Sequence, residues 1–330
     1  MKSLLLMLVS VAATAPGPSS AAAVPKVQQR IALHDGGWDI LTVDPASHRV
    51  LVSRADGVDA IDTRTGQVTS RLITGSRFHG VTVVPGAPLA VATEAAGSAI
   101  VFNPVTGKVS GEVKSDPDAD ATIYEPGTRT VWVMNGDSGT ITIVDPFAVT
   151  AIAKISVGGS LEFPAIDGRG HLFVNVADKG ELAEVDIAKR TVMRRIVLSG
   201  CQHPTGLAYL NSGVLLSACA NGVAKVTRAS DGQALADIAI GPRPDGAFAD
   251  EPRHRAYVPS GGDGSLTVID TSGPIPRKTM TVETQVGSRT GAVDPSTGIV
   301  YLPAARFGPP PAAGGRPVLV PGSVELLVVH

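Results

Sequence analysis

A short phrase recurs along the chain with little change. Residues 139–145 read GTITIVD, and residues 264–270 read GSLTVID. The last position of this phrase has equivalents at intervals of about 42 residues, the spacing typical of β-propeller blades. The equivalent positions are Asp62, Asn103, Asp145, Asp186, Arg228 and Asp270. Because every copy must adopt the same local structure, this repeat restricts the possible folds more than any other feature of the sequence.

Each repeat unit contains four short apolar runs separated by turn residues. The first run leads into a turn such as Asp-Pro at 44–45, and a β-branched run such as TVWV at 130–133 follows it. The third run is the VID phrase, and the fourth follows a turn such as Thr-Gly at 65–66. Runs of this length and composition favour β-strands. The sequence therefore predicts an all-β chain built from four-stranded antiparallel blades.

The two ends of the chain are expected to complete one blade. The last unit starts near residue 288 and ends after its third strand, in SVELLVVH at 323–330. An unassigned strand, KVQQRIALHDG at 26–36, precedes the first unit. Placing it as the fourth strand of the last unit closes the ring and removes open sheet edges. We predict a seven-bladed β-propeller closed by an N-terminal strand in the last blade.

Most acidic residues of the repeat are expected at turns. They stand before turn-forming residues, where an Asp side chain accepts hydrogen bonds from its own backbone a few residues on. We therefore interpret them as structural rather than catalytic. The residues concerned are Asp44, Asp62, Asp145, Asp186, Asp270 and Asp294.

The first residues have the features of a secretory signal peptide. Lys2 precedes an apolar segment, residues 4–13, which is too short to span a bilayer. Cleavage sites with small residues end at Ala15 and at Ala23, and the sequence does not choose between them. We expect residues 1–23 to be a signal peptide and residues 24–330 to form a single propeller domain, located in the periplasm or secreted. No later run is long and apolar enough to cross a membrane.

Two cysteines, Cys201 and Cys219, fall within one repeat unit. An oxidising compartment would allow them to form a disulfide, which we predict. The alternative is a pair of buried free thiols, which behave as small apolar side chains.

The repeat resembles a known family. The phrases GTITIVDP, GSLTVIDT and DPASHRVLVS are similar to the YVTN-type repeat of the YncE-like periplasmic seven-bladed β-propellers, over about residues 24–330. The fifth unit departs from the pattern, because Arg228 replaces the usual acid. The resemblance implies the propeller fold and a periplasmic location. It implies no particular activity, because one fold hosts unrelated functions.

One polar residue of each unit falls where the chain begins the first strand of a blade. In a propeller this strand lines the central channel, so these residues should surround one mouth of the channel and form a candidate ligand site. The predicted ligand-binding residues are Asp39, His79, Asp120, Glu162, His203, Asp245 and Arg289. The fifth unit aligns loosely, and Thr205 is an alternative to His203. The competing interpretation is that these residues serve turn geometry at a channel mouth filled with water.

An insertion in the last unit, residues 306–322, is expected on the same face. It contains three consecutive prolines and then two glycines, which favour a stiff segment followed by a flexible one. The insertion either folds over the mouth, with Arg306 or Arg316 reaching inward, or is a surface loop without function.

The sequence offers no recognisable metal or nucleophile motif. His34, His79 and His203 come from separate blades, without the dense His/Asp/Glu cluster of metal enzymes, so we predict no metal site and no cofactor. A Gly-x-Ser-x-Gly elbow is absent as well. We therefore assign no catalytic residue.

Two functions remain open. The first is a non-catalytic binding or scaffold protein, expected to be monomeric, whose partner is a small molecule or a periplasmic protein. The alternative is a hydrolase of lactonase type or a sugar-related dehydrogenase with its site at the channel mouth, which would need two carboxylates and a histidine within reach of one another. Nucleic-acid binding is disfavoured by the net charge of −2 and the aromatic content of 4%.

Overall fold

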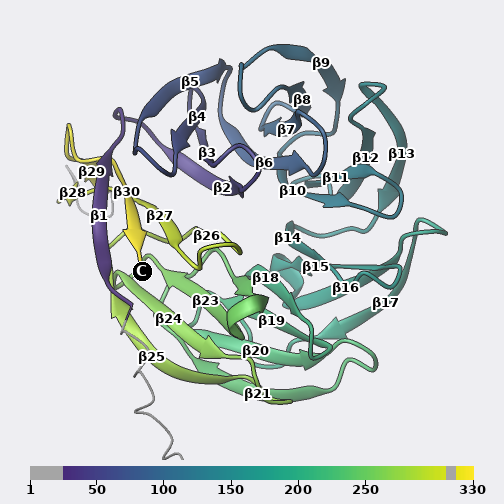
Figure 1. Cartoon of the computed structure of the whole chain (residues 1–330). Helices are drawn as coiled ribbons and strands as arrows, with labels where there is room; N and C mark the ends of the chain where they lie inside the picture. Colours follow the sequence, from purple (N-terminus) through teal and green to yellow (C-terminus); the bar gives the residue numbers. More distant parts are fainter. Residues whose placement is uncertain (1–24, 310–316) are drawn as a thin grey trace, which may run out of the picture.

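The computed structural model describes residues 25–309 and 317–330. In it, seven four-stranded antiparallel sheets stand in a ring around a central channel (Figure 1). The predicted seven-bladed β-propeller is therefore confirmed. The predicted signal peptide, residues 1–23, lies outside the described residues. In the part of the chain that the structure describes, no helix has the length and apolar character needed to cross a membrane.

Blades 1 to 3 each consist of four consecutive strands that run outward from the channel. Blade 1 contains β2 (Trp38–Asp44), β3 (Arg49–Arg54), β4 (Gly57–Asp62) and β5 (Val68–Thr74). Blade 2 contains β6 (Phe78–Val84), β7 (Leu89–Glu94), β8 (Ser98–Phe102) and β9 (Val109–Lys114). Blade 3 contains β10 (Ala119–Glu125), β11 (Thr130–Asn135), β12 (Thr140–Asp145) and β13 (Thr150–Ser156).

Blades 4 to 6 repeat this order, and two of them include a short 3-10 turn. Blade 4 contains β14 (Leu161–Ile166), β15 (His171–Val176), η1 (Ala177–Lys179), β16 (Glu181–Asp186) and β17 (Thr191–Val197). Blade 5 contains β18 (Pro204–Leu210), β19 (Val214–Cys219), β20 (Val223–Arg228) and β21 (Ala234–Ala239). Blade 6 contains β22 (Phe248–Asp250), η2 (Glu251–Arg253), β23 (Arg255–Ser260), β24 (Ser265–Asp270) and β25 (Arg277–Glu283).

Blade 7 joins the two ends of the chain. From the channel outward, its strands are β26 (Ala292–Val293), β27 (Val300–Ala304), β30 (Glu325–Val329) and β1 (Val27–Ala32). β1 pairs antiparallel with β30, and Ile31 lies opposite Leu326. The prediction that the N-terminal strand completes the last blade is therefore confirmed. A separate hairpin of β28 (Phe307–Gly308) and β29 (Val318–Leu319) lies between β27 and β30.

The hydrophobic core lies between neighbouring blades. Every residue of β11 is buried, because adjacent blades cover both faces of the middle strands. Trp132 and Met134 of blade 3 pack with Leu172 and Val174 of blade 4 in a single cluster. This face-to-face packing fixes the angle between blades and hence the width of the channel.

The repeat carboxylates bind their own turns, as predicted. Oδ1 of Asp62 accepts hydrogen bonds from the backbone N–H groups of Arg64 and Thr65, at 2.9 and 3.0 Å. Equivalent bonds to the following backbone are made by Asp44, Asp145, Asp186, Asp270 and Asp294.

Cys201 and Cys219 form a disulfide, as predicted, with their Cα atoms 5.3 Å apart. Cys219 ends β19 and lies opposite Pro204, the first residue of β18. The bridge therefore ties the loop that leads into β18 to the neighbouring strand of blade 5, next to the channel mouth.

Replacing Ile31 by alanine is expected to destabilise the closed ring. Ile31 is 9% exposed and belongs to the cluster that contains Leu326 and Val328. Because the lost methyl groups leave a cavity, the free energy of unfolding should fall by roughly 2–3 kcal/mol in chemical denaturation. Gln29→Ala, at an exposed site on the same strand, should change it by less than about 0.5 kcal/mol. Equal losses of unfolding free energy in the two variants would show that the packing of β1 in blade 7 does not stabilise the ring.

Candidate functional site

Polar side chains reach the channel mouth from the second residue of the inner strand in five of the seven blades. In blades 1 to 5, the first residue of the inner strand pairs with the last residue of the next strand, and an irregular step in the ladder follows. Such a step bends the strand and redirects the side chain located there. The residues at this step are Asp39, His79, Asp120, Glu162 and Thr205.

Blades 6 and 7 complete the ring of polar residues. Pro244 forms an isolated bridge with Ser260, and Asp245 follows it directly. Arg289 precedes β26 and contacts Asp245. We call the residues Asp39, His79, Asp120, Glu162, Asp245 and Arg289 the mouth ring.

Thr205, rather than His203, occupies the corresponding position in blade 5. His203 lies before β18 with an exposed side chain and a φ of 49°. The Thr205 hydroxyl donates a hydrogen bond of 3.2 Å to the carbonyl of Pro244. Thr205, the alternative given for this loosely aligned unit, therefore holds the ring position, and ligand binding by His203 stays a prediction.

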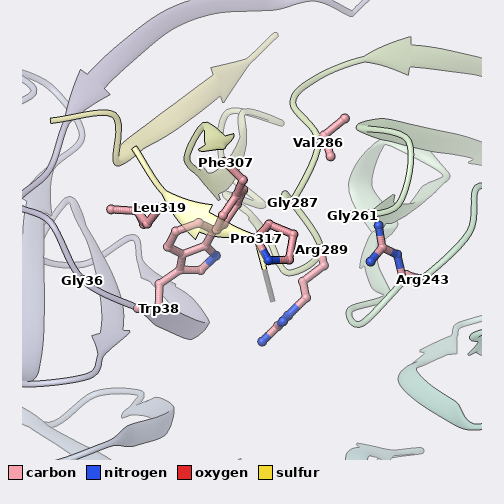
Figure 2. A pocket seen from close by; sticks show the side chains of 11 residues that line it. Gly36, Trp38, Arg243, Gly261, Val286, Gly287, Arg289, Phe307, Pro317 and Leu319 are labelled. Atoms are coloured by element: carbon pink, nitrogen blue, oxygen red, sulfur yellow. The ribbon is translucent and has the colours of Figure 1, made fainter. Parts of the chain in front are cut away.

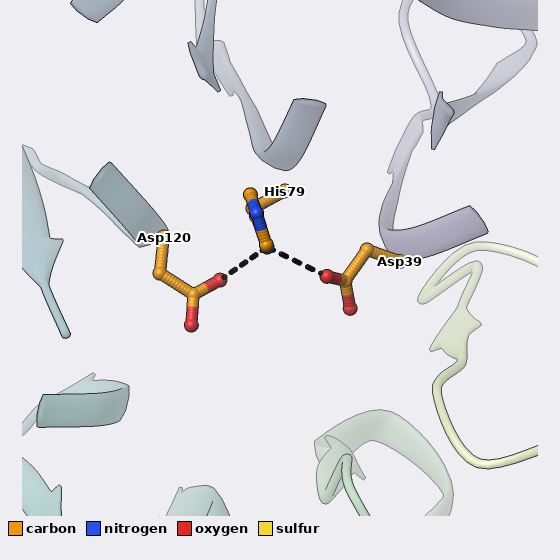
Figure 3. Close-up of side chains that lie close together, drawn as sticks. All are labelled: Asp39, His79 and Asp120. Carbon is orange, nitrogen blue, oxygen red and sulfur yellow. Dashed lines mark hydrogen bonds and ion pairs between the residues drawn. The ribbon is translucent and has the colours of Figure 1, made fainter. Parts of the chain in front are cut away.

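Asp39, His79 and Asp120 meet although they belong to three different blades (Figure 3). Nδ1 of His79 lies 2.9 Å from Oδ2 of Asp39 and 3.5 Å from Oδ1 of Asp120. Because both neighbours are carboxylates, Nδ1 carries a hydrogen and donates it to Asp39. Gly80 permits the close approach of blades 2 and 3, since a Cβ there would lie 2.4 Å from the Asp120 carbonyl oxygen.

Arg289 links the opposite side of the mouth to the same cluster. Its Nε lies 2.7 Å from Oδ2 of Asp245, and its Nη2 lies 4.0 Å from Oδ1 of Asp39. Asp39 therefore faces His79 with one oxygen and Arg289 with the other. The Asp39 carbonyl also accepts a hydrogen bond of 2.8 Å from the Thr290 hydroxyl, which joins blade 1 to blade 7.

The mouth ring holds protons that isolated carboxyl groups would lose. Burial within the channel, together with the charges of Asp245 and Asp39, raises the pKa of Glu162 to about 8. Burial also raises the pKa of Asp245 to about 6, although Arg289 opposes that shift. The pKa of Asp120 is raised well above its ordinary value by burial and by the nearby Asp39 and Glu162.

The two basic groups of the ring are stabilised in their charged forms. The hydrogen bond to Asp39 raises the pKa of His79, against the opposing effect of burial. The charge of Asp245 raises the pKa of Arg289. Asp39 and Asp245 are each paired with a basic group of the ring, and the raised pKa of Glu162, about 8, keeps that carboxyl mostly protonated at neutral pH. About a fifth of the Asp39 side chain, 21%, remains exposed, so water and small solutes reach the ring.

Asp39, His79 and Asp120 also present one possible metal-ligand atom each, all within 4.8 Å of one another. A metal-bound histidine usually donates its other ring N–H to an acceptor. Nε2 of His79 is buried without a hydrogen-bond partner among the described residues. Nδ1 would moreover have to give up its hydrogen bond to Asp39. The fit to a metal ion is therefore incomplete, and the absence of a metal stays a prediction.

A cavity of about 800 Å³ opens beside the mouth ring (Figure 2). Trp38, Phe307 and Leu319 line one end, Arg243 lines the other, and Arg289 belongs to both the cavity and the ring. The volume suits a small organic ligand.

The insertion lies on the predicted face, because its hairpin β28–β29 supplies part of the cavity wall. Arg306 was one of two arginines expected to reach the mouth. It lines a different, smaller cavity with Arg30 and Gln285 instead. Arg316 lies outside the described residues. A covering role of the insertion stays a prediction.

Of the residues that line the cavity, only Arg289 was among the predicted site residues, and Trp38, Phe307 and Arg243 were missed. Trp38 packs against Phe307 and also faces the cavity. Arg243 lies two residues before Asp245, in a loop position that shows no repeat pattern in sequence. Its spacing of two residues from Asp245 is the one sequence feature that could have identified Arg243.

Comparisons with known proteins show the fold alone. No protein-family model matches the chain, and no curated protein matches it either. A chain of hydrazine synthase from Kuenenia stuttgartiensis is 15% identical, with a TM-score of 0.71, over 92% of this chain and 99% of that chain. A chain of a mitotic checkpoint complex is 11% identical, with a TM-score of 0.77, over 100% of this chain and 99% of that chain. At these identities the likeness concerns architecture.

Protein stability should fall as the pH rises from about 5 to about 8. The folded state holds the Glu162 proton up to a pKa of about 8, against 4.5 for the ordinary side chain, so between these values only the unfolded chain loses it. Glu162→Gln should remove this pH dependence. At pH 9 the free energy of unfolding of the variant should exceed that of wild type by about 2 kcal/mol, a figure reduced to allow for water in the channel.

Urea denaturation at several pH values measures this effect. Glu112→Gln, at an exposed site on β9, is the matched control and should follow the wild-type profile. Parallel pH profiles for wild type and Glu162→Gln would contradict the raised pKa.

Proposed function

We propose that this chain is a non-catalytic binding protein that takes up a small polar ligand at the mouth ring. The proposal rests on one observation. Six titratable side chains from six blades meet at one mouth of the channel, beside a cavity of about 800 Å³. A concave surface with a few polar groups that meet in this way is typical of ligand sites.

We further propose that it belongs with the YncE-like periplasmic propellers and acts as a monomer. The repeat phrases support this assignment, and the propeller fold suits a binding or scaffold role. The Cys201–Cys219 disulfide is compatible with an oxidising compartment such as the periplasm or the extracellular space. In this proposal residues 1–23 are a signal peptide and residues 24–330 are the mature domain.

The chemistry of the ring suits a ligand that both donates and accepts hydrogen bonds. Protonated Glu162 donates, whereas ionised Asp39 accepts. Arg289 is held by Asp245, so its charge is already compensated. A ligand rich in hydroxyl or amide groups can replace channel water without separating these ion pairs.

A thermal-shift screen tests the proposal. The probes are glucose, gluconate, putrescine, glycine amide, and the chlorides of Mg²⁺, Ca²⁺ and Zn²⁺. We expect at least one probe to raise the melting temperature of wild type, and Asp39→Asn to reduce that shift by more than half. Asp137→Asn, which changes an exposed carboxylate in the β11–β12 loop, should leave the shift unchanged. A shift that survives Asp39→Asn would place binding elsewhere, and no shift with any probe would contradict the proposal.

A lactonase-type hydrolase is the second candidate, because Asp39 and Asp120 both lie within 3.5 Å of Nδ1 of His79. This arrangement puts two carboxyl groups and a histidine within reach of one substrate. In such an enzyme one carboxylate would activate water as the general base, and protonated His79 would act as the general acid. The assay is hydrolysis of dihydrocoumarin, followed by absorbance. Turnover that falls at least about 100-fold in His79→Gln would support catalysis, because one general acid or base typically contributes 10²–10⁴-fold. Turnover at the buffer rate would exclude this substrate class.

A further inference from the structure

The cavity beside the mouth ring has two chemically different ends (Figure 2). One end is apolar and is formed by Trp38, Phe307 and Leu319. The other end carries the Arg243 guanidinium, with Arg289 between the two ends. A ligand that fills the cavity therefore meets a hydrocarbon surface and a positive charge at the same time.

The apolar end is a built surface with an open aromatic face. The ring centroids of Trp38 and Phe307 are 6.2 Å apart and their planes are tilted by 43°. Phe307 is nevertheless 42% exposed, which is large for an aromatic ring that is held by packing. Gly287 makes room for it, because a Cβ there would lie 2.6 Å from the Phe307 ring. The hairpin is also anchored, since the Asp35 carboxylate accepts a hydrogen bond from the Gly322 N–H at 2.9 Å.

The charged end combines a fixed backbone with a free side chain. The Arg243 carbonyl accepts a hydrogen bond from the Gly261 N–H at 3.0 Å, and the Arg243 N–H donates one to the Ala220 carbonyl at 3.4 Å. No carboxylate within residues 25–309 or 317–330 forms an ion pair with the Arg243 guanidinium. Its position is therefore set by the backbone, while its donors remain open to a ligand.

The mouth ring does not compete for the same ligand charge. Asp39 lies between His79 and Arg289, and Asp245 is paired with Arg289. The raised pKa of Glu162, about 8, keeps that carboxyl mostly neutral at pH 7. Of the two charged residues that line the cavity, Arg289 is paired with Asp245, whereas Arg243 has no ion pair within the described residues. The positive charge of Arg243 therefore attracts an anion.

We infer that the cavity binds a small organic anion in which a flat hydrocarbon ring is joined to a carboxylate. The ring lies against Trp38 and Phe307, and the carboxylate accepts hydrogen bonds from Arg243. Guanidinium and carboxylate match in shape and form paired hydrogen bonds, and aromatic side chains bind flat rings by stacking. This inference rests on the proposed binding function and names the ligand class of that face.

Intrinsic fluorescence reports on this cavity directly. The chain has two tryptophans, and Trp132 is buried at 1% exposure in the core between blades 3 and 4. A ligand in the cavity therefore changes the emission of Trp38 alone. The probes are phenylacetate, the neutral analogue phenylacetamide, the cation phenethylamine, and acetate, which lacks the ring. Each is titrated into wild type at pH 7.5 and low salt, and calorimetry confirms the affinities.

Arg243→Gln tests the charged end against a matched control. We expect wild type to bind phenylacetate at least about tenfold more tightly than phenylacetamide and acetate. Arg243→Gln should remove most of this difference in affinity. The affinity for phenylacetamide should stay unchanged. Arg77→Gln is the control, because Arg77 is exposed and precedes β6 in the same left-handed conformation, with a φ of 52°, but does not line the cavity. Phe307→Ala should weaken phenylacetate and phenylacetamide equally.

Each outcome decides the inference. Failure of phenylacetate to bind, equal affinity for the anion and its neutral analogue, or equal effects of Arg243→Gln and Arg77→Gln would overturn it. Tighter binding of phenethylamine that is lost in Asp39→Asn would also overturn it, while leaving the proposed binding function in place. The proposed function is tested separately, because it fails when no probe of the thermal-shift screen raises the melting temperature.

Discussion

The pairing of β1 with β30 is the interaction on which the rest of the structure depends. It closes a ring in which each blade buries its faces against two neighbours, so the channel width is set by all seven interfaces together. The mouth-ring residues come from six different blades. Their distances, such as 2.9 Å between His79 and Asp39, therefore depend on a closed ring and would not survive a gap between blades 7 and 1.

Local backbone chemistry then determines which side chains reach the channel. In blades 1 to 5, the irregular step after the first pair of the inner strand turns the second side chain toward the mouth. Gly80 lets two inner strands approach until His79 contacts Asp120. The ionisation of the mouth ring follows from these short distances. Four carboxyl groups in a narrow space cannot all ionise, and burial together with mutual repulsion raises the pKa of Glu162 and of Asp120.

The repeat was sufficient to predict the blades, the closure and the turn role of carboxylates such as Asp62, because each depends on local spacing. It also located the ring positions in six blades. In the fifth unit, where the turn markers are weak, it left His203 and Thr205 as alternatives, and Thr205 holds the ring position. The contacts of His79, the protons held by the ring and the cavity around Phe307 depend on distances between blades and on an insertion outside the repeat, so no periodicity encodes them.

A ring of blades does not by itself determine activity, because one fold hosts unrelated functions. The function of this chain must therefore be argued from the side chains that it places at one mouth. Trp38 and Asp39 are neighbours on β2, yet the first faces the cavity and the second faces the mouth ring. Arg289 likewise belongs to both. A ligand bound against Trp38 would therefore lie next to the short stretch of backbone that holds Asp39 between His79 and Arg289, so the cavity and the mouth ring share both a strand and a side chain.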